Sequence, residues 1–234
     1  MSDTDRPERV TRDPVNSVIL DTLESIGFQR LGIMHNQAWD EDPRHLLFTF
    51  SRYKFVAKML TGKRNVVEVG CGDAFGSRLV KQEVETLTVT DFDPLFIRDI
   101  EERASERWPM RSFVHDALSG PVAGGPYDGL YSLDVMEHLP QSQEDHYLEN
   151  ITASVTDDAA VIIGMPSLES QQYASPASQA GHINCKTGPD FRGTLSRHFR
   201  NVFLFSMNDE MVHTGYHKMA HYLLGVCTQP IRSR

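Results

Sequence analysis

Three residues able to take part in acid–base chemistry, Asp134, Glu137 and His138, stand close together in the sequence. If a helical turn begins at Asp134, the spacing i, i+3 and i+4 places the three side chains on one side of that turn. They directly follow Gly129–Leu133, an apolar run that predicts a strand. Open α/β sheets bind ligands at the carboxyl ends of their strands, so we expect these side chains to face a binding site.

A glycine-rich turn follows the first strand-like run, which begins at Asn65. Glycine allows the backbone to turn sharply and to approach a ligand closely. Gly70 and Gly72 fit the start of a dinucleotide-binding fingerprint, but the third glycine, Gly76, comes one residue late. The carboxylate of Glu68 would also repel a pyrophosphate, whereas it would favour a cationic ligand. An NAD(P)-dependent oxidoreductase is therefore a disfavoured alternative.

Strands alternate with helical segments along most of the chain, which predicts βαβ units and a mostly parallel sheet. Two helices are expected before the first strand, one over Pro14–Phe28 and one from about Asp42 through Leu60. The last two strands are separated by a polar segment and are expected to close the sheet as an antiparallel pair. The expected strands are Asn65–Gly70, Leu87–Thr90, Arg111–Val114, Gly129–Leu133, Ala160–Gly164, Val202–Met207 and His221–Cys227.

The chain length of 234 residues fits one domain with appendages. Residues 1–13 are charged and polar and predict a mobile tail, residues 14–61 a helical cover, and residues 62–234 the ligand-binding domain. A polar stretch after Ser167 has no apolar periodicity and reaches His182, which makes it a candidate lid.

Composition narrows the possible partners. The net charge of −9 argues against a protein that tracks nucleic-acid phosphates or an anionic membrane surface. Three scattered cysteines make a poor disulfide framework, so a reducing, cytoplasmic location is expected. No apolar run is long enough for a membrane span. A small-molecule partner is the remaining expectation.

Five segments, in order and spacing, resemble the motifs of class I S-adenosylmethionine-dependent methyltransferases. The resemblance implies a Rossmann-like α/β fold with a mostly parallel seven-stranded sheet, an antiparallel last strand and N-terminal helices. It covers roughly residues 60 to 170, and Ala74 departs from it where many members have glycine. The segments are Glu68-x-Gly70-x-Gly72, Val89–Pro94, His115–Ala117, Pro126–Leu133 and Met136–Pro140.

The same resemblance implies S-adenosylmethionine as the cofactor. Asp91 would accept both ribose hydroxyls in charge-assisted hydrogen bonds, and Asp116 would face the adenine amine. A helix-capping role is the alternative for Asp91, although Asp93 is better placed to cap. The cofactor-binding candidates are Glu68, Gly70, Cys71, Gly72, Asp91, Phe92, Asp116, Ala117, Leu133 and Tyr53.

The segment Asp134-x-x-Glu137-His138, with the later His182, resembles the metal site of ubiquinone-biosynthesis O-methyltransferases and small-RNA 2′-O-methyltransferases. The resemblance implies that these four residues hold a divalent cation. Mixed oxygen and imidazole ligands suit Mg²⁺, Mn²⁺ or Fe²⁺ better than structural zinc. Asp134 stands where those relatives have the longer glutamate. The alternative is that His138 acts alone beside the reacting methyl group, as a base or a positioning residue.

The sequence thus predicts a methyltransferase that acts on a small-molecule, sugar or phenolic hydroxyl, with Glu137, His138 and His182 as catalytic candidates and divalent-metal assistance as an option. An N-methyltransferase of a small amine is the alternative within the same fold. A binding protein that holds S-adenosylmethionine without catalysis is a further alternative, but it would have no use for convergent histidines and carboxylates.

Overall fold

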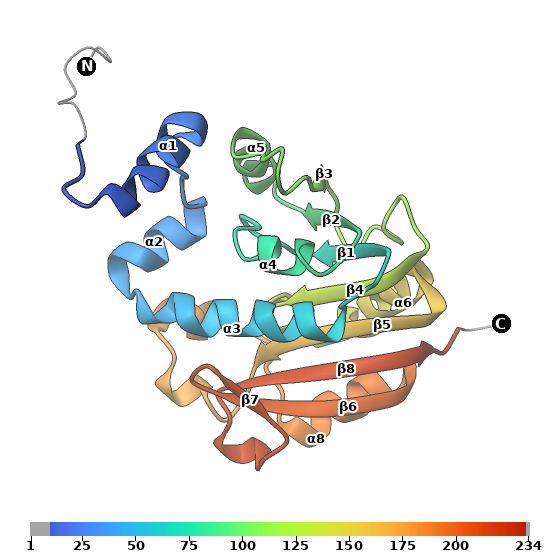
Figure 1. Ribbon diagram of the computed structural model, residues 1–234. Coiled ribbons are helices and arrows are strands. Elements are labelled where there is room, and N and C mark those ends of the chain that lie inside the picture. The colour runs from blue at the N-terminus through green and yellow to red at the C-terminus, as the bar shows by residue number, and fades with distance from the viewer. Residues whose placement is uncertain (1–9, 233–234) are drawn as a thin grey trace. The chain divides into compact units, whose positions relative to one another are not determined.

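In a computed structural model of the protein, residues 10–232 are described, and the chain divides after Leu31 into two compact units (Figure 1). The first unit contains the short 3₁₀ helix η2 (Pro14–Asn16) and helix α1 (Ser17–Ile26). Asp13 caps η2 by accepting a hydrogen bond from the N–H of Val15. The helix expected over Pro14–Phe28 is confirmed. Most of the predicted tail, residues 1–13, lies outside the described residues.

The second unit, from Gly32 onward, is built on one sheet of mostly parallel strands (Figure 1). The strand order is β3-β2-β1-β4-β5-β8-β6-β7, and β8 pairs antiparallel with both β5 and β6. The strands are β1 (Asn65–Val69), β2 (Thr86–Asp91), β3 (Arg111–Val114), β4 (Tyr127–Leu133), β5 (Val155–Pro166), β6 (Phe199–Asn208), β7 (Met211–His213) and β8 (Tyr222–Pro230).

The predicted fold class is confirmed, with one difference in strand number. The described residues form eight strands rather than the expected seven. The additional strand is β7, which pairs with the end of β6. It lies in the segment between the last two expected strands, which was expected to be only a polar connection. Three residues of mixed polarity are too few to produce a readable alternation pattern.

Helices cover both faces of the sheet, and each face has its own buried core. Helices α3, α4 and α5 contribute to one core, and α6 and α8 to the other (Figure 1). The boundary expected after residue 61, between a helical cover and a ligand-binding domain, stays a prediction. The helices are α2 (Ile33–Glu41), α3 (Arg44–Met59), α4 (Ser77–Lys81), α5 (Pro94–Glu102), α6 (Glu144–Ser154), α7 (Pro176–Gly181) and α8 (Gly188–Ser196), with 3₁₀ turns η3 (Met136–His138), η4 (Gln141–Gln143), η5 (Gln171–Tyr173) and η6 (His217–Met219).

Helix α2 was not expected from the sequence. Its weakly amphipathic sequence buries only His35, so no apolar periodicity marked it. Strand β1, by contrast, has four consecutive buried residues because helices cover both faces of the parallel strands. The carboxyl ends of the parallel strands lie at one edge of the sheet. At this edge the glycine turn follows β1, Asp91 is the last residue of β2, and Asp134 follows β4.

Gly164 in β5 provides a test of packing beneath that edge. A Cβ at this position would lie 2.7 Å from Cδ2 of Leu133 and 2.8 Å from the ring of Tyr222. We expect Gly164→Ala to lower the free energy of unfolding by about 1–3 kcal/mol, as overpacked cores do. Urea denaturation measures the change. Gly193→Ala in α8 is the matched control, because nothing lies within 4 Å of its Cβ; this variant should be neutral or up to about 1 kcal/mol more stable.

Candidate active site

The glycine turn after β1 requires glycine at two positions. Gly70 and Gly72 have φ angles of 74° and 51°, in the left-handed region. A Cβ at Gly70 would lie 2.2 Å from Cγ2 of Val135. The N–H groups of Gly70 and Cys71 both donate to the carbonyl oxygen of Thr90, at 2.8 and 2.9 Å, which ties the turn to the end of β2.

Asp91, at the end of β2, holds the turn from the other side. Its Oδ2 accepts from the N–H of Gly72 at 2.9 Å, and its Oδ1 accepts from the N–H of Asp93 at 2.9 Å. Each carboxylate oxygen can accept a further hydrogen bond. Asp93 caps α5 by accepting from the N–H of Leu95, so the capping role falls to Asp93, as expected, and Asp91 keeps acceptor capacity toward the sheet edge.

Glu68 lies beneath the turn in the buried core, with 1% of its surface exposed. The hydroxyls of Tyr53 and Tyr131 donate to its carboxylate, each at 2.7 Å, and the hydroxyl of Ser77 donates to it as well. Burial raises the pKa of Glu68 to about 7, although the three hydroxyls oppose this rise. Glu68 and Tyr53 are thus brought together below the glycine turn.

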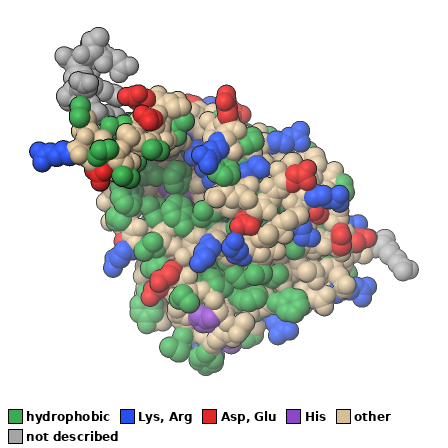
Figure 2. Space-filling view, viewed as in Figure 1, with side chains coloured by type: hydrophobic (Ala, Val, Ile, Leu, Met, Phe, Trp, Pro, Cys, Tyr) green, Lys and Arg blue, Asp and Glu red, His purple; other side chains and the backbone are tan. Residues whose placement is uncertain are grey.

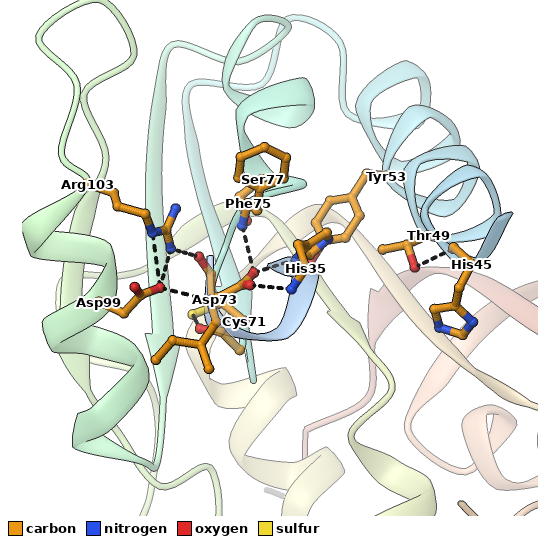
Figure 3. Close-up of polar contacts among 12 residues, drawn as sticks. His35, His45, Thr49, Tyr53, Cys71, Asp73, Phe75, Ser77, Asp99 and Arg103 are labelled. Atoms are coloured by element: carbon orange, nitrogen blue, oxygen red, sulfur yellow. Dashed lines mark hydrogen bonds and ion pairs between the residues drawn. The ribbon is translucent and has the colours of Figure 1, made fainter. Parts of the chain in front are cut away.

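Helix α2 is fastened to the glycine turn by a contact that the sequence did not predict (Figure 3). Asp73 accepts from the backbone N–H of His35 at 2.9 Å and contacts its ring Nδ1 at 2.7 Å. The His35 ring stacks against Phe50 and lies beside Phe75, with centroids 5.8 and 5.2 Å away. A Cβ at Gly32 would lie 2.3 Å from the Asp73 carboxylate, so the chain passes directly over the turn here.

The remaining cofactor candidates lie around the same edge. Phe92 is exposed and Leu133 is buried. Asp116 uses Oδ1 to accept from the N–H of Leu118 at 2.9 Å, while Ala117 packs against the buried core. Burial, with the nearby carboxylates, holds the pKa of the Cys71 thiol well above its usual range, so this cysteine is an unreactive packing residue.

Glu137, His138 and His182 come together as expected. One ligand atom of each lies within 4.8 Å of the others, and the two imidazole rings are 5.1 Å apart between centroids. Glu137 and His138 belong to the 3₁₀ turn η3, and His182 ends helix α7. The polar stretch after Ser167 therefore delivers His182 to the end of β4.

Both histidines are oriented by a hydrogen bond at Nδ1. The Nδ1 of His138 donates to the carbonyl oxygen of Gly181 at 3.0 Å, and the Nδ1 of His182 donates to Oε1 of Gln171 at 3.0 Å. With the proton on Nδ1, Nε2 of each ring carries the lone pair that a cation needs. Burial and the neighbouring His138 lower the pKa of His182, which keeps that ring neutral near pH 7.

Glu137 is the unsatisfied member of the cluster. Its side chain is fully buried, and neither carboxylate oxygen has a hydrogen-bond partner. Burial, with the charge of Asp134, holds its pKa well above the usual range. A buried carboxylate without partners is costly unless a proton or a cation compensates it.

Asp134 is placed differently from the expectation. Its φ angle of 56° puts it outside the helical turn, which begins only at Met136. Its carboxylate instead accepts two hydrogen bonds from Arg52, at 2.8 and 3.1 Å. The buried guanidinium of Arg52 also lies 3.8 Å from the centroid of the Tyr222 ring. Sequence inspection missed this pair, because Arg52 lies on a helix expected as a cover, and no pattern in the sequence links it to Asp134, 82 residues later.

Comparison with known proteins now bears on this site. Residues 66–158 match the methyltransferase domain family, and this stretch includes the glycine turn, Asp91 and the 134–138 segment. The stretch that carries the candidate site is thus similar to a methyltransferase domain. Comparison with curated proteins finds no match.

Three solved structures share the fold of this chain. The N-methyltransferase NodS from Bradyrhizobium japonicum, in complex with S-adenosyl-L-homocysteine, is 16% identical with a TM-score of 0.63, over 82% of this chain and 90% of that chain. The methyltransferase domain of a bacterial Hen1 is 16% identical with a TM-score of 0.64, over 77% and 98%. The magnesium protoporphyrin IX methyltransferase from Synechocystis is 16% identical with a TM-score of 0.56, over 93% and 98%.

Asp91 provides the first test of the expected cofactor site. If it accepts two ribose hydroxyls, Asp91→Ala removes two charge-assisted bonds of about 1.5–3 kcal/mol each, and the Kd for S-adenosylhomocysteine should rise at least about 100-fold. Isothermal titration calorimetry measures the Kd. Asp93→Ala is the matched control, because it removes only the cap of α5 and should keep wild-type affinity. A folded Asp91→Ala variant with unchanged affinity would contradict the ribose role.

Glu68 provides a test by pH. Its pKa near 7 in the folded protein exceeds the ordinary value of 4.5, so the folded state binds the proton more tightly than the unfolded state does. The stabilisation is complete below about pH 4.5 and is lost as pH rises through 7, a difference of about 3 kcal/mol. Glu68→Gln should remove this part of the pH dependence in urea denaturation between pH 5 and 8.

The control for this titration is Glu85→Gln, which changes an exposed carboxylate just before β2. That variant should keep the wild-type dependence. An unchanged pH profile in Glu68→Gln would show that Glu68 is ionised throughout this range.

Proposed function

We propose that the protein methylates a hydroxyl group of a small molecule, with a divalent cation held by Glu137, His138 and His182. The partnerless carboxylate of Glu137 is the observation that carries the proposal, because a cation would supply the compensation that this buried group lacks. The imidazoles of His138 and His182, each with one ring nitrogen within 4.8 Å of the other ligand atoms, complete the donor set. One carboxylate and two imidazoles without thiolate suit Mn²⁺, Fe²⁺ or Mg²⁺.

When bound, a divalent cation lowers the proton affinity of an acceptor oxygen, so that the hydroxyl is deprotonated near neutral pH. The chain's own residues do the rest. Asp91 and the glycine turn hold the cofactor at the sheet edge, and the 137–138 turn holds the acceptor opposite it, so that methyl donor and acceptor align. Arg52 neutralises Asp134, which leaves Glu137 as the carboxylate available to the cation.

The surroundings of the cluster favour an acceptor with an apolar or aromatic part, such as a phenol. Leu168, Tyr173 and Ile183 belong to the same stretch as His182, and all three are exposed. Acidic and basic side chains are interspersed over the face seen in Figure 2, rather than gathered into a basic surface that nucleic acid would need. No helix within residues 10–232 has the length and apolar character needed to cross a bilayer.

A small amine is the second candidate acceptor. The partnerless carboxyl of Glu137 could accept hydrogen bonds from an ammonium group, and the positive charge of the ammonium would favour the ionised form of this carboxyl. An amine acceptor needs no cation for deprotonation, so dependence on metal distinguishes the two candidates.

Metal removal is therefore the test. With a phenol that proves to be an acceptor, dialysis against EDTA should abolish methyl transfer from radiolabelled S-adenosylmethionine, and Mn²⁺ or Mg²⁺ should restore it. His182→Ala should reduce the metal-restored rate at least 10-fold, in line with the loss of a cation ligand. The Kd for S-adenosylhomocysteine should stay within twofold in every case, because the glycine turn is held by hydrogen bonds to Thr90 and Asp91 and not by the side chains of the cluster.

His213→Ala is the matched control, since His213 lies in β7 and bonds only within its own hairpin region, to Asn208 and Gly215. It should behave as wild type. Full activity after chelation, together with a severe loss in His138→Ala, would replace the metal with His138 acting alone as the base. Metal-independent methylation of amines would favour the second candidate.

A further inference from the structure

We propose that Lys186 is a positioning residue that holds His182 against His138 and Glu137. The inference rests on the proposed function for its catalytic meaning, but its structural content does not depend on a metal. Lys186 lies outside the cluster, yet it is the point at which the polar stretch from Ser167 returns to the sheet.

Lys186 forms a buried ion pair with the first residue of α6. Its Nζ lies 2.7 Å from Oε2 of Glu144, and the two residues are 6% and 4% exposed. Asn184 completes the arrangement, since its side-chain amide donates to Glu144 at 3.1 Å and its Oδ1 accepts from Lys186 at 3.2 Å. Arg197 donates to the other oxygen of Glu144 at 3.1 Å, so both carboxylate oxygens are satisfied.

The backbone around Lys186 joins the two ends of the polar stretch. Ser167 and Lys186 form an isolated parallel β-bridge, and the N–H of Leu168 donates to the carbonyl oxygen of Lys186 at 2.9 Å. Two residues earlier, the N–H of Asn184 donates to the carbonyl oxygen of Glu137 at 2.9 Å. The segment from residue 184 to 186 is thereby fixed to the turn that carries Glu137, and His182 lies only two residues before it.

A buried ion pair is weak evidence for stability, because desolvation of the two charges offsets much of their attraction. Its geometric demands are strict, however, and each member leaves a costly unpaired charge if it shifts. The network is thus satisfied by only one placement of residues 184–186, and any other placement leaves a buried charge unpaired. The hydrogen bonds that orient the two imidazole rings come from Gly181 and Gln171, which are less buried than Asn184 and Lys186.

The test uses the full chain in four forms: wild type, Lys186→Met, the double variant Glu144→Gln with Lys186→Met, and Lys58→Met. Lys58 pairs with Glu83 at the surface and is the matched control for the lysine-to-methionine change. Four quantities are measured in each: the hydrogen-exchange protection of the Asn184 amide, the Kd for Mn²⁺ by electron paramagnetic resonance, the Kd for S-adenosylhomocysteine, and the melting temperature.

We expect Lys186→Met to lower the protection of the Asn184 amide at least 10-fold and to raise the Kd for Mn²⁺ by about 10-fold, the lower end of the effect of losing an outer-shell partner, because Lys186 acts on the cluster through Asn184. Affinity for S-adenosylhomocysteine should change less than twofold. The double variant removes both charges and should regain much of the thermal stability, but not the Mn²⁺ affinity. This separation distinguishes positioning from general stabilisation. Lys58→Met should match wild type throughout.

Wild-type amide protection and Mn²⁺ affinity in Lys186→Met would overturn the proposal, as would recovery of both in the double variant. If wild type itself binds no Mn²⁺, the metal-assisted function fails, whereas the exchange of the Asn184 amide still decides whether Lys186 fixes the segment.

Discussion

The ion pair between Arg52 and Asp134 is the interaction on which the arrangement of the candidate site depends. Arg52 comes from α3, Asp134 from the end of β4, and the Tyr222 ring against the guanidinium from β8. The pair therefore joins a covering helix, the parallel half of the sheet and its antiparallel half at one point. Because the guanidinium is buried, removing Asp134 would leave an uncompensated buried charge, which typically costs several kcal/mol. Glu137 lies within the electrostatic influence of this pair.

Much of the fold follows from patterns that are local in the sequence. Buried parallel strands such as β1 appear as short β-branched runs, and the helices between them show apolar periodicity. The glycine turn was predictable because positive φ angles restrict the residue type at Gly70 and Gly72. The meeting of His138 and His182 could also be predicted, but only through resemblance to related sites, since no local pattern relates residues so far apart.

The features that sequence inspection missed depend on tertiary contacts. Helix α2 has little apolar periodicity, and its place is determined by His35 and Asp73, which the sequence separates widely. Asp134 was expected in the helical turn, but its pairing with Arg52 stabilises a left-handed backbone conformation just before the turn. Lys186 and Glu144 look like ordinary surface residues in the sequence, because charge alone does not reveal burial.

The position of β8 has a consequence for the order in which the protein assembles during synthesis. Although β8 is the last strand along the described chain, it lies between β5 and β6 inside the sheet. Until residue 230 has left the ribosome, β5 therefore has an open edge and Arg52 lacks the ring of Tyr222. A nascent chain can form its glycine turn early, but the contact between Arg52 and Tyr222 can form only when synthesis of this strand is finished. Its exposed strand edge makes the interval before completion the stage most prone to mispairing.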